Sequence, residues 1–320
     1  MEKKVYKNVN ELIEILSSRG MTFSRPIRAK RLLTQNNYYS VTAFKHLFYK
    51  SGTRLYIEGT DFEDLFTVYV YDKKLKMAIL RQLLFIETKI KSAMSIVLSE
   101  KYGIKANQYL KKENFDLTNP NVDSTLKKVK QQIKNFGSKN PCVSHYKKTH
   151  GYVPFWVLSK CLTMGVVRDL FNIMKPDDQN IVSTYVLERK IERKPVRTLK
   201  TMIALMADIR NMCAHDEMLL SYKHNRITLT PLLEHTYLNL KKTDGGEYIQ
   251  GRKDLLALLI CIRYLINKTL FNNLLSHISK MTNDTYAKIQ HLVTKSAFLE
   301  YIGLCDEYEK LRVYDYLIAE

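Results

Sequence analysis

An arginine and a histidine five residues apart are the side chains in this sequence best suited to chemistry on a phosphate. Arg210 and His215 are the first and last residues of the run Arg-Asn-Met-Cys-Ala-His. Histidine titrates near neutral pH, so it can accept a proton from one oxygen and donate one to another. Arginine stays charged and offers a planar set of donors to phosphate oxygens. RNA carries its own nucleophile, the 2′-hydroxyl. This pair could therefore cleave RNA with no metal ion and no other cofactor.

The pair must be positioned by an amphipathic helix. Within the run from 195 to 220, apolar side chains recur at steps of three and four between Leu199 and Cys213, which predicts a helix packed on a core with Arg210 and His215 near its far end. Positions five apart lie about 140° apart around a helix, so Arg210 and His215 do not share a face. They can act on one phosphate if the helix ends or bends between them, or if two copies meet in a dimer, which we favour. Asn211 is four residues from His215 and could hold its imidazole in one tautomer. The structural alternative is that Arg210 and His215 only cap the helix end.

Length and composition favour an all-α fold. The chain has 320 residues, 45% of them hydrophobic, and only 11 glycines and 7 prolines, which favours long helices over a turn-rich β architecture. Five cysteines without metal-ligand spacing argue against both a zinc site and a disulfide framework. No run of 18 uncharged apolar residues occurs, so we expect no membrane span and a cytoplasmic protein.

The strong positive charge predicts a polyanionic partner. Lysine and arginine total 51 against 32 acidic residues, a formal net charge of +19, and such an excess attracts nucleic acid. We expect RNA, held by basic stretches that in part interleave with aromatic rings. The alternative is that the rings belong to the core and the lysines to a solvated face. The residues predicted to bind RNA are Arg25, Arg28, Lys30, Arg31, Tyr38, Tyr39, Lys127, Lys128, Lys130, Lys134, Lys147, Lys148, Arg189, Arg193, Lys194 and Arg197.

Changes in composition divide the chain into three predicted regions. Residues 1–58 form a small helical region rich in basic and aromatic side chains, and residues 59–235 form a helical core with a lysine-rich insertion at about 103–151. Asp244-Gly245-Gly246-Glu247 reads as a linker before a helical extension at 248–320. Hydrophobic spacing and capping residues predict the following elements: helices at 11–18 (capped by Asn10), 26–36, 61–102 (one or two long helices), 124–136, 152–174, 181–187 and 253–277, two or three more within 280–320, and a short strand or extended segment at 227–230.

One acidic residue stands out within the predicted long helix. Glu87 lies among strongly apolar neighbours, four residues before Lys91. The spacing predicts an ion pair between them. A charge in such a run is most often a satisfied carboxylate that is buried or at an interface.

Several short stretches occur together in this order: Leu16-Ser17-Ser18-Arg19-Gly20-Met21, Asn37-Tyr38-Tyr39 followed by Phe44, Tyr71-Asp72-Lys73-Lys74-Leu75, Phe85-Ile86-Glu87-Thr88-Lys89-Ile90-Lys91, His145-Tyr146, Pro154-Phe155-Trp156, Leu162-Thr163-Met164-Gly165 and the Arg210–His215 run. With them the chain resembles, over about residues 12–225, the Abi family of prokaryotic abortive-infection proteins, the Abi-D/Abi-F-like group of the HEPN superfamily.

The resemblance implies an all-α HEPN bundle that forms a homodimer with a composite, metal-independent ribonuclease site. By that pattern Arg210 and His215 are the catalytic pair, and Asn211 is the polar residue that follows the arginine. The expected role is phage defence or a toxin-antitoxin system, in some relatives with a structured non-coding RNA. This sequence departs from the pattern just after the motif, where the carboxylates of Asp216 and Glu217 would repel RNA phosphate.

Two functions therefore remain from the sequence. The first is an RNA-cleaving defence effector with His215 as general acid and base and Arg210 stabilising charge on the phosphate. The second is a non-catalytic protein that holds a structured RNA through the basic stretches. The two differ in whether bound RNA is cut or intact.

Overall fold

The protein is helical throughout the part of the chain that the computed structural model describes, which comprises residues 5–188, 191, 194–220, 222–224 and 227–312. Fifteen α-helices and four short 3-10 helices occur in these residues, and no strand does. The all-α prediction is confirmed. The HEPN arrangement of the helices stays an expectation from the resemblance.

The α-helices in chain order are α1 (Val9–Ser17), α2 (Pro26–Gln35), α3 (Tyr38–Thr42), α4 (Phe62–Tyr102), α5 (Ala106–Tyr109), α6 (Val122–Phe136), α7 (Pro141–His150), α8 (Phe155–Leu158), α9 (Met164–Ile173), α10 (Pro176–Val186), α11 (Pro195–Ala214), α12 (Leu233–Tyr237), α13 (Leu255–Leu265), α14 (Lys268–Ile289) and α15 (Lys295–Tyr301). The 3-10 helices are η1 (Ala43–Phe48), η2 (Lys112–Asn114), η3 (Ser159–Cys161) and η4 (Tyr308–Arg312).

A single helix of 41 residues, α4, is the spine of the molecule. Asp61 caps its N-terminus in a reciprocal capping box with Asp64, and Gly103 ends it with φ of 88°. At 1.5 Å per residue it is about 60 Å long. Because α4 packs against α14, α10, α11, α8 and α3, its apolar residues are buried on several sides.

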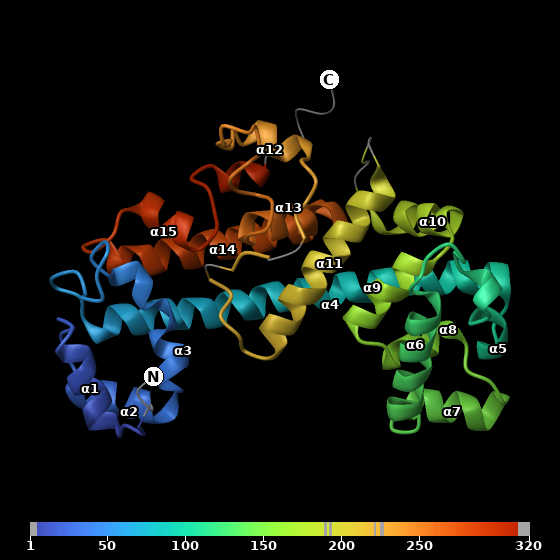
Figure 1. Cartoon of the computed structure of the whole chain (residues 1–320), viewed down its shortest axis with the longest axis horizontal. Helices are drawn as coiled ribbons and strands as arrows, with labels where there is room; N and C mark the ends of the chain where they lie inside the picture. Colours follow the sequence, from blue (N-terminus) through green and yellow to red (C-terminus); the bar gives the residue numbers. More distant parts are fainter. Residues whose placement is uncertain (1–4, 189–190, 192–193, 221, 225–226, 313–320) are drawn as a thin grey trace.

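The other helices surround α4 in three groups (Figure 1). Helices α1–α3 form an N-terminal lobe at one end of α4, and α5–α8 form a second lobe at the other end. Both lobes project to the same side of α4, whereas α12–α15 lie along the opposite side. Helix α11 crosses α4, and its C-terminal end emerges between the two lobes.

Helix α11 ends close to the motif, as the apolar spacing predicts. It begins at Pro195, where the missing N–H costs nothing, and it ends at Ala214. The next residues leave the helix because Asp216 has φ of 58°, in the left-handed region. The buried face includes Leu199, Met206 and Ile209, as the apolar spacing predicts.

Some helix boundaries differ from the predictions for local reasons. The cap of α1 is Asn8, whose side chain accepts from Asn10 and Glu11, so the prediction of Asn10 as the cap is wrong. The predicted helix at 152–174 is broken into α8, η3 and α9, with Leu162 extended between them. The predicted helix at 253–277 is two helices, because Asn267 caps a new one, α14.

Two loop predictions also changed in detail. Residues 227–230 are irregular chain and form no strand. The Asp244–Glu247 stretch, predicted as a linker, is a tight turn closed by a bridge between Lys242 and Tyr248. One hydrophobic cluster joins buried residues of the N-terminal lobe, α4, α11 and α13. No helix in the described residues has the length and hydropathy needed to cross a membrane.

Candidate functional site

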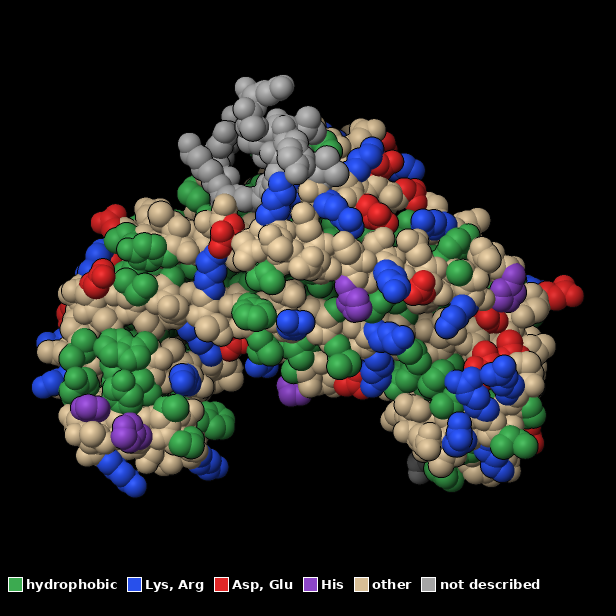
Figure 2. Space-filling view, turned by 180° about the vertical axis from the view of Figure 1, so that it is seen from behind, with side chains coloured by type: hydrophobic (Ala, Val, Ile, Leu, Met, Phe, Trp, Pro, Cys, Tyr) green, Lys and Arg blue, Asp and Glu red, His purple; other side chains and the backbone are tan. Residues whose placement is uncertain are grey.

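The Arg210–His215 motif occupies the last turn of α11 and the residue after it. The side chain of Arg210 is 28% exposed, and both Asn211 and His215 are exposed. Figure 2 shows the molecule from behind, with a hollow between the two projecting lobes and Lys and Arg side chains on both lobes. The end of α11 comes out on this side of α4, so the motif has access to solvent between two basic lobes.

The guanidinium of Arg210 is held by α4. Its Nε donates to Glu87 Oε2 at 3.3 Å. The other oxygen, Glu87 Oε1, accepts from Lys91 Nζ at 2.7 Å, and Lys91 also donates to the carbonyl of Leu162 at 2.7 Å. The predicted Glu87–Lys91 pair is confirmed, and the carboxylate is satisfied as expected. What the sequence did not indicate is that the second partner of Glu87 is Arg210.

The segment that follows His215 is also fixed to α4. Asp216 forms ion pairs with Lys73 and with Lys76, the latter at 2.7 Å. Lys76 Nζ also donates to the carbonyl of Glu217 at 3.0 Å and pairs with Asp72 at 2.8 Å. We call residues 216–220 the closing segment, because it turns the chain back along α4 after the motif.

Asp72 holds the far end of the closing segment. Its buried Oδ1 accepts from the backbone N–H groups of Leu219 and Leu220, both at 3.0 Å. A carboxylate that accepts from two backbone N–H groups and also pairs with an ammonium group is held in one orientation, so it fixes the position of the closing segment. This in turn limits where His215 can lie.

Of the two carboxylates that the sequence analysis expected to repel RNA, that of Asp216 is paired with lysines, whereas that of Glu217 is exposed and forms no ion pair among the described residues. Burial would raise the pKa of Asp216, but hydrogen bonds from Lys73 and Lys76 outweigh it and lower the pKa below its ordinary value. In return, these pairs raise the pKa of Lys76 against the opposing effect of burial. Lys73 and Lys76 balance the charges of Asp72 and Asp216, so RNA phosphate would meet no uncompensated acid from this pair of residues.

Asn211 and His215 are joined through the main chain. The backbone N–H of His215 donates to the carbonyl of Asn211 at 2.9 Å. Within the described residues no hydrogen bond links their side chains or occupies the imidazole of His215. Helix α11 neither ends nor bends between Arg210 and His215, because His215 is the C-cap residue and keeps the helical hydrogen bond. The dimer is therefore the condition that remains for the two side chains to act on one phosphate.

The residues predicted to bind RNA fall into separate groups. Arg25, Arg28, Lys30 and Arg31 lie at or on α2 in the N-terminal lobe, where Arg28 pairs with Glu63 at 2.7 Å. Tyr39 beside them is 68% exposed, whereas Tyr38 is half-buried and packs against the core.

The second group belongs to the lobe at the other end of α4. It consists of exposed lysines on α6 and α7, namely Lys127, Lys128, Lys130, Lys134, Lys147 and Lys148. Lys128 pairs with Asp169 at 3.0 Å. Lys127, Lys130 and Lys134 line one groove of about 420 Å³.

The third group lies at the start of α11. Lys194, with φ of 51°, and Arg197 are exposed there, while Arg189 and Arg193 lie outside the described residues. The three groups are thus spread over the length of α4 and the far end of α11, and the fold does not gather them into one patch.

We call the C-terminal end of α11 with residues 210–215 the motif end. Residues that the sequence analysis did not assign to it hold it in place. Asp72, Lys73, Lys76 and Glu87 hold the motif and the closing segment, and all lie on α4. A signal was present, because Asp72 and Lys76 have the four-residue spacing of a helical ion pair. Among the described residues, no three His, Cys, Asp or Glu side chains come close enough together to hold a metal ion.

Comparison with known proteins identifies the family of this chain. A family described as "Abi-like protein" matches residues 31–221, more than half of the chain. The chain belongs to the Abi-like protein family. The matched region of this Abi-like protein contains α4, α11 and the motif, and it excludes Arg25, Arg28 and α12–α15. Membership indicates a role in abortive infection, a form of phage defence. No curated protein and no solved structure matches the chain.

Proposed function

We propose that this Abi-like protein is a metal-independent endoribonuclease that acts as a homodimer in phage defence. One observation carries the proposal. Three stretches far apart in sequence, at 71–75, 85–91 and 210–215, meet at the end of α11, where α4 fixes Arg210 and the closing segment and leaves His215 open. Such an arrangement suits proton transfer beside a held phosphate.

The proposed reaction is an internal transfer at phosphorus. His215 of one protomer accepts the proton of the 2′-hydroxyl as its oxygen attacks the adjacent phosphorus. The bond from phosphorus to the 5′-oxygen breaks, and that oxygen takes a proton from the partner's His215. Arg210 stabilises the extra negative charge on the phosphate oxygens in the transition state. The products are a 2′,3′-cyclic phosphate and a free 5′-hydroxyl.

An exposed apolar stripe on α4 supports the homodimer. Met77, Leu84 and Phe85 are 74%, 46% and 53% exposed. Leu84 lies about 80° around α4 from Lys76 and so directly beside the face that holds the closing segment. Large apolar groups exposed together in this way favour burial against a partner. A second copy that covers this stripe would bring the two motif ends close together.

The dimer has its own test. Leu84→Glu places a charge in the stripe and should give a monomer by sedimentation and a loss of RNA cleavage. The melting temperature should stay close to that of the wild type because the side chain is exposed in the monomer. A dimer that persists in this variant would contradict the interface.

The nuclease reaction is tested with His215→Ala. Growth arrest and RNA cleavage should be lost, with folding unchanged because the side chain is exposed. His277→Ala is the matched control, since His277 is also exposed but lies on α14. Purified wild type should give fragments that end in cyclic phosphate. Undiminished cleavage by His215→Ala would refute the assignment.

The second candidate is a non-catalytic protein that holds a structured non-coding RNA. The exposed lysines along the α6 groove favour it, because a row of ammonium groups can follow a phosphate backbone. A discrete, intact RNA that co-purifies and leaves at high salt would support this function, whereas fragments ending in cyclic phosphate would support cleavage.

A further inference from the structure

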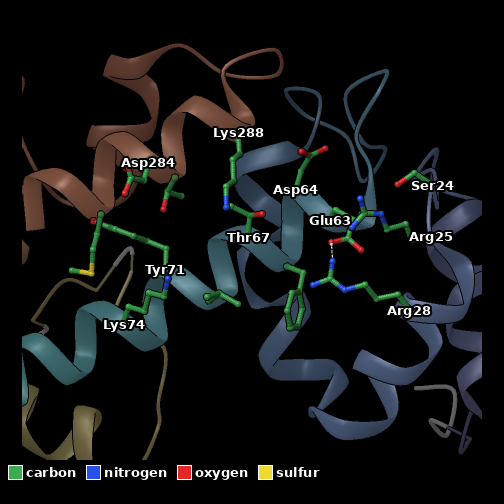
Figure 3. A pocket seen from close by; sticks show the side chains of 14 residues that line it. Ser24, Arg25, Arg28, Glu63, Asp64, Thr67, Tyr71, Lys74, Asp284 and Lys288 are labelled. Atoms are coloured by element: carbon green, nitrogen blue, oxygen red, sulfur yellow. Dashed lines mark hydrogen bonds and ion pairs between the residues drawn. The ribbon is translucent and has the colours of Figure 1, made fainter.

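A cleft near the N-terminal end of α4 offers a second place for a charged ligand. It measures about 680 Å³ and lies between the start of α2, the N-terminal turns of α4 and the C-terminal turns of α14 (Figure 3). Four basic side chains line it: Arg25, Arg28, Lys74 and Lys288. They come from three different helical segments, so only the folded chain brings them together.

Three of these four basic side chains have no ion-pair partner among the described residues. Arg28 is paired with Glu63 at 2.7 Å. Among the described residues, Arg25, Lys74 and Lys288 form no ion pair and no side-chain hydrogen bond. Cations that line a cavity and have no ion-pair partner are available to an anionic ligand. The arrangement therefore favours a ligand that carries a phosphate.

Three acidic side chains share the cleft with the four basic ones. Glu63 is held by Arg28, but its Oε1 is buried and has no hydrogen-bond partner. Asp64 accepts from the backbone N–H of Asp61 and lies 3.6 Å from His291. Asp284 also lines the cleft. These three carboxylates offset part of the positive charge of the cleft, and Glu63 Oε1 is closed to solvent, so a ligand does not reach it.

The cleft also has an apolar wall. Phe66 is half-buried, and its ring lies in a row with Phe62 and Tyr69, at centroid distances of 6.1 and 5.4 Å. Val70 and Met281 line the cleft beside it. A flat ligand can pack on such a surface. Unpaired cations and an aromatic wall together suit a nucleotide.

The cleft adjoins the motif end along α4. Lys74 lines the cleft, and its neighbour Lys73 pairs with Asp216 of the closing segment. Arg25 and Arg28 precede the family-matched region, and Lys288 follows it. The part of the cleft outside α4 is thus added to the family core by segments of this chain that the family match does not include.

We propose that this cleft binds one nucleotide of an RNA chain that continues to the motif end, and so selects which RNA this protein engages. The inference rests on the proposed function. Lys74 and Lys288 contact phosphate groups of this RNA, and the base packs on Phe66.

The test measures binding separately from cleavage. In a His215→Ala background, a fluorescent single-stranded oligoribonucleotide is titrated and followed by anisotropy. Lys74→Gln with Lys288→Gln should weaken binding at least 10-fold and reduce the slope of log K against log salt by about 1.4, for two lost phosphate contacts. Lys280→Gln is the control, because Lys280 is exposed on α14 and does not line the cleft. Unchanged affinity in the double variant would overturn the proposal.

Further arms separate the remaining outcomes. Adenosine and guanosine monophosphates are tested as competitors, and tight binding of a monophosphate that the oligoribonucleotide cannot displace would overturn the RNA proposal in favour of a free nucleotide. If His215→Ala alone abolishes cleavage while the lysine variant binds and cleaves like wild type, the cleft proposal fails and the proposed function stands. If wild type binds no RNA, both fail.

Discussion

The carboxylate of Glu87 provides the sharpest test of how Arg210 is positioned. Glu87→Gln removes one negative charge and keeps the size and shape of the side chain. The carboxylate lies between two cations, at 3.3 Å from Arg210 Nε and 2.7 Å from Lys91 Nζ. Its side chain is only 10% exposed, so water can replace little of what the change removes.

The size of the effect follows from these contacts. A hydrogen bond to a charged group contributes about 1.5–3 kcal/mol, and the amide of glutamine keeps one acceptor oxygen, so we expect a loss of about 1–3 kcal/mol in the free energy of unfolding. The guanidinium of Arg210 would lose its only anchor among the described residues. A catalytic group displaced by about 1 Å can cost about 100-fold in rate, so we expect kcat for RNA cleavage to fall by about 10- to 100-fold.

The assay compares cleavage of a labelled RNA with thermal unfolding of the same samples. We expect kcat to fall with little change in KM, because Arg210 acts on charge that develops in the transition state. Glu188→Gln is the control, since it removes the partner of Lys89 on α4 without contacting Arg210. If Glu87→Gln lowers the melting temperature but cleaves like wild type, Glu87 is structural only and the positioning argument is refuted.

Three further predictions concern the closing segment and its surroundings. Asp72→Ala should cost about 3–5 kcal/mol in chemical denaturation, because it leaves buried backbone donors and a buried lysine without their partner; a loss below 1 kcal/mol would contradict this. The lowered pKa of Asp216 means that its ion pairs stabilise the fold above the ordinary carboxyl pKa and are lost as pH falls through the lower, folded value. Hydrogen exchange of the closing segment, corrected for intrinsic rates, should therefore increase below about pH 4 and stay constant from pH 5 to 8. Burial raises the pKa of Cys213 to about 12, so iodoacetamide at pH 8 should modify exposed Cys142 well before Cys213, as followed by mass spectrometry.

The sequence by itself determined the helical class and the helix that carries the motif. The apolar spacing around Leu199 and Ile209 required a helix that buries one face, and Pro195 fixed where that helix begins. These are local properties, since periodicity and proline geometry act within a few residues. The spacing of Glu87 and Lys91 likewise predicted their ion pair correctly.

Only the tertiary structure decided what surrounds the motif. The four-residue spacing indicated that Glu87 pairs with Lys91, but the contact with Arg210 joins residues 123 positions apart. The end of α11 at Ala214 depends on Asp216, whose position is set by lysines of α4. The sequence likewise did not indicate which basic residues lie together. Arg25 and Lys288 line the same cleft, whereas Lys127 lies in the opposite lobe. Local spacing fixes which face of a helix a side chain occupies, but the packing of α4 against α11 and α14 determines what that face meets.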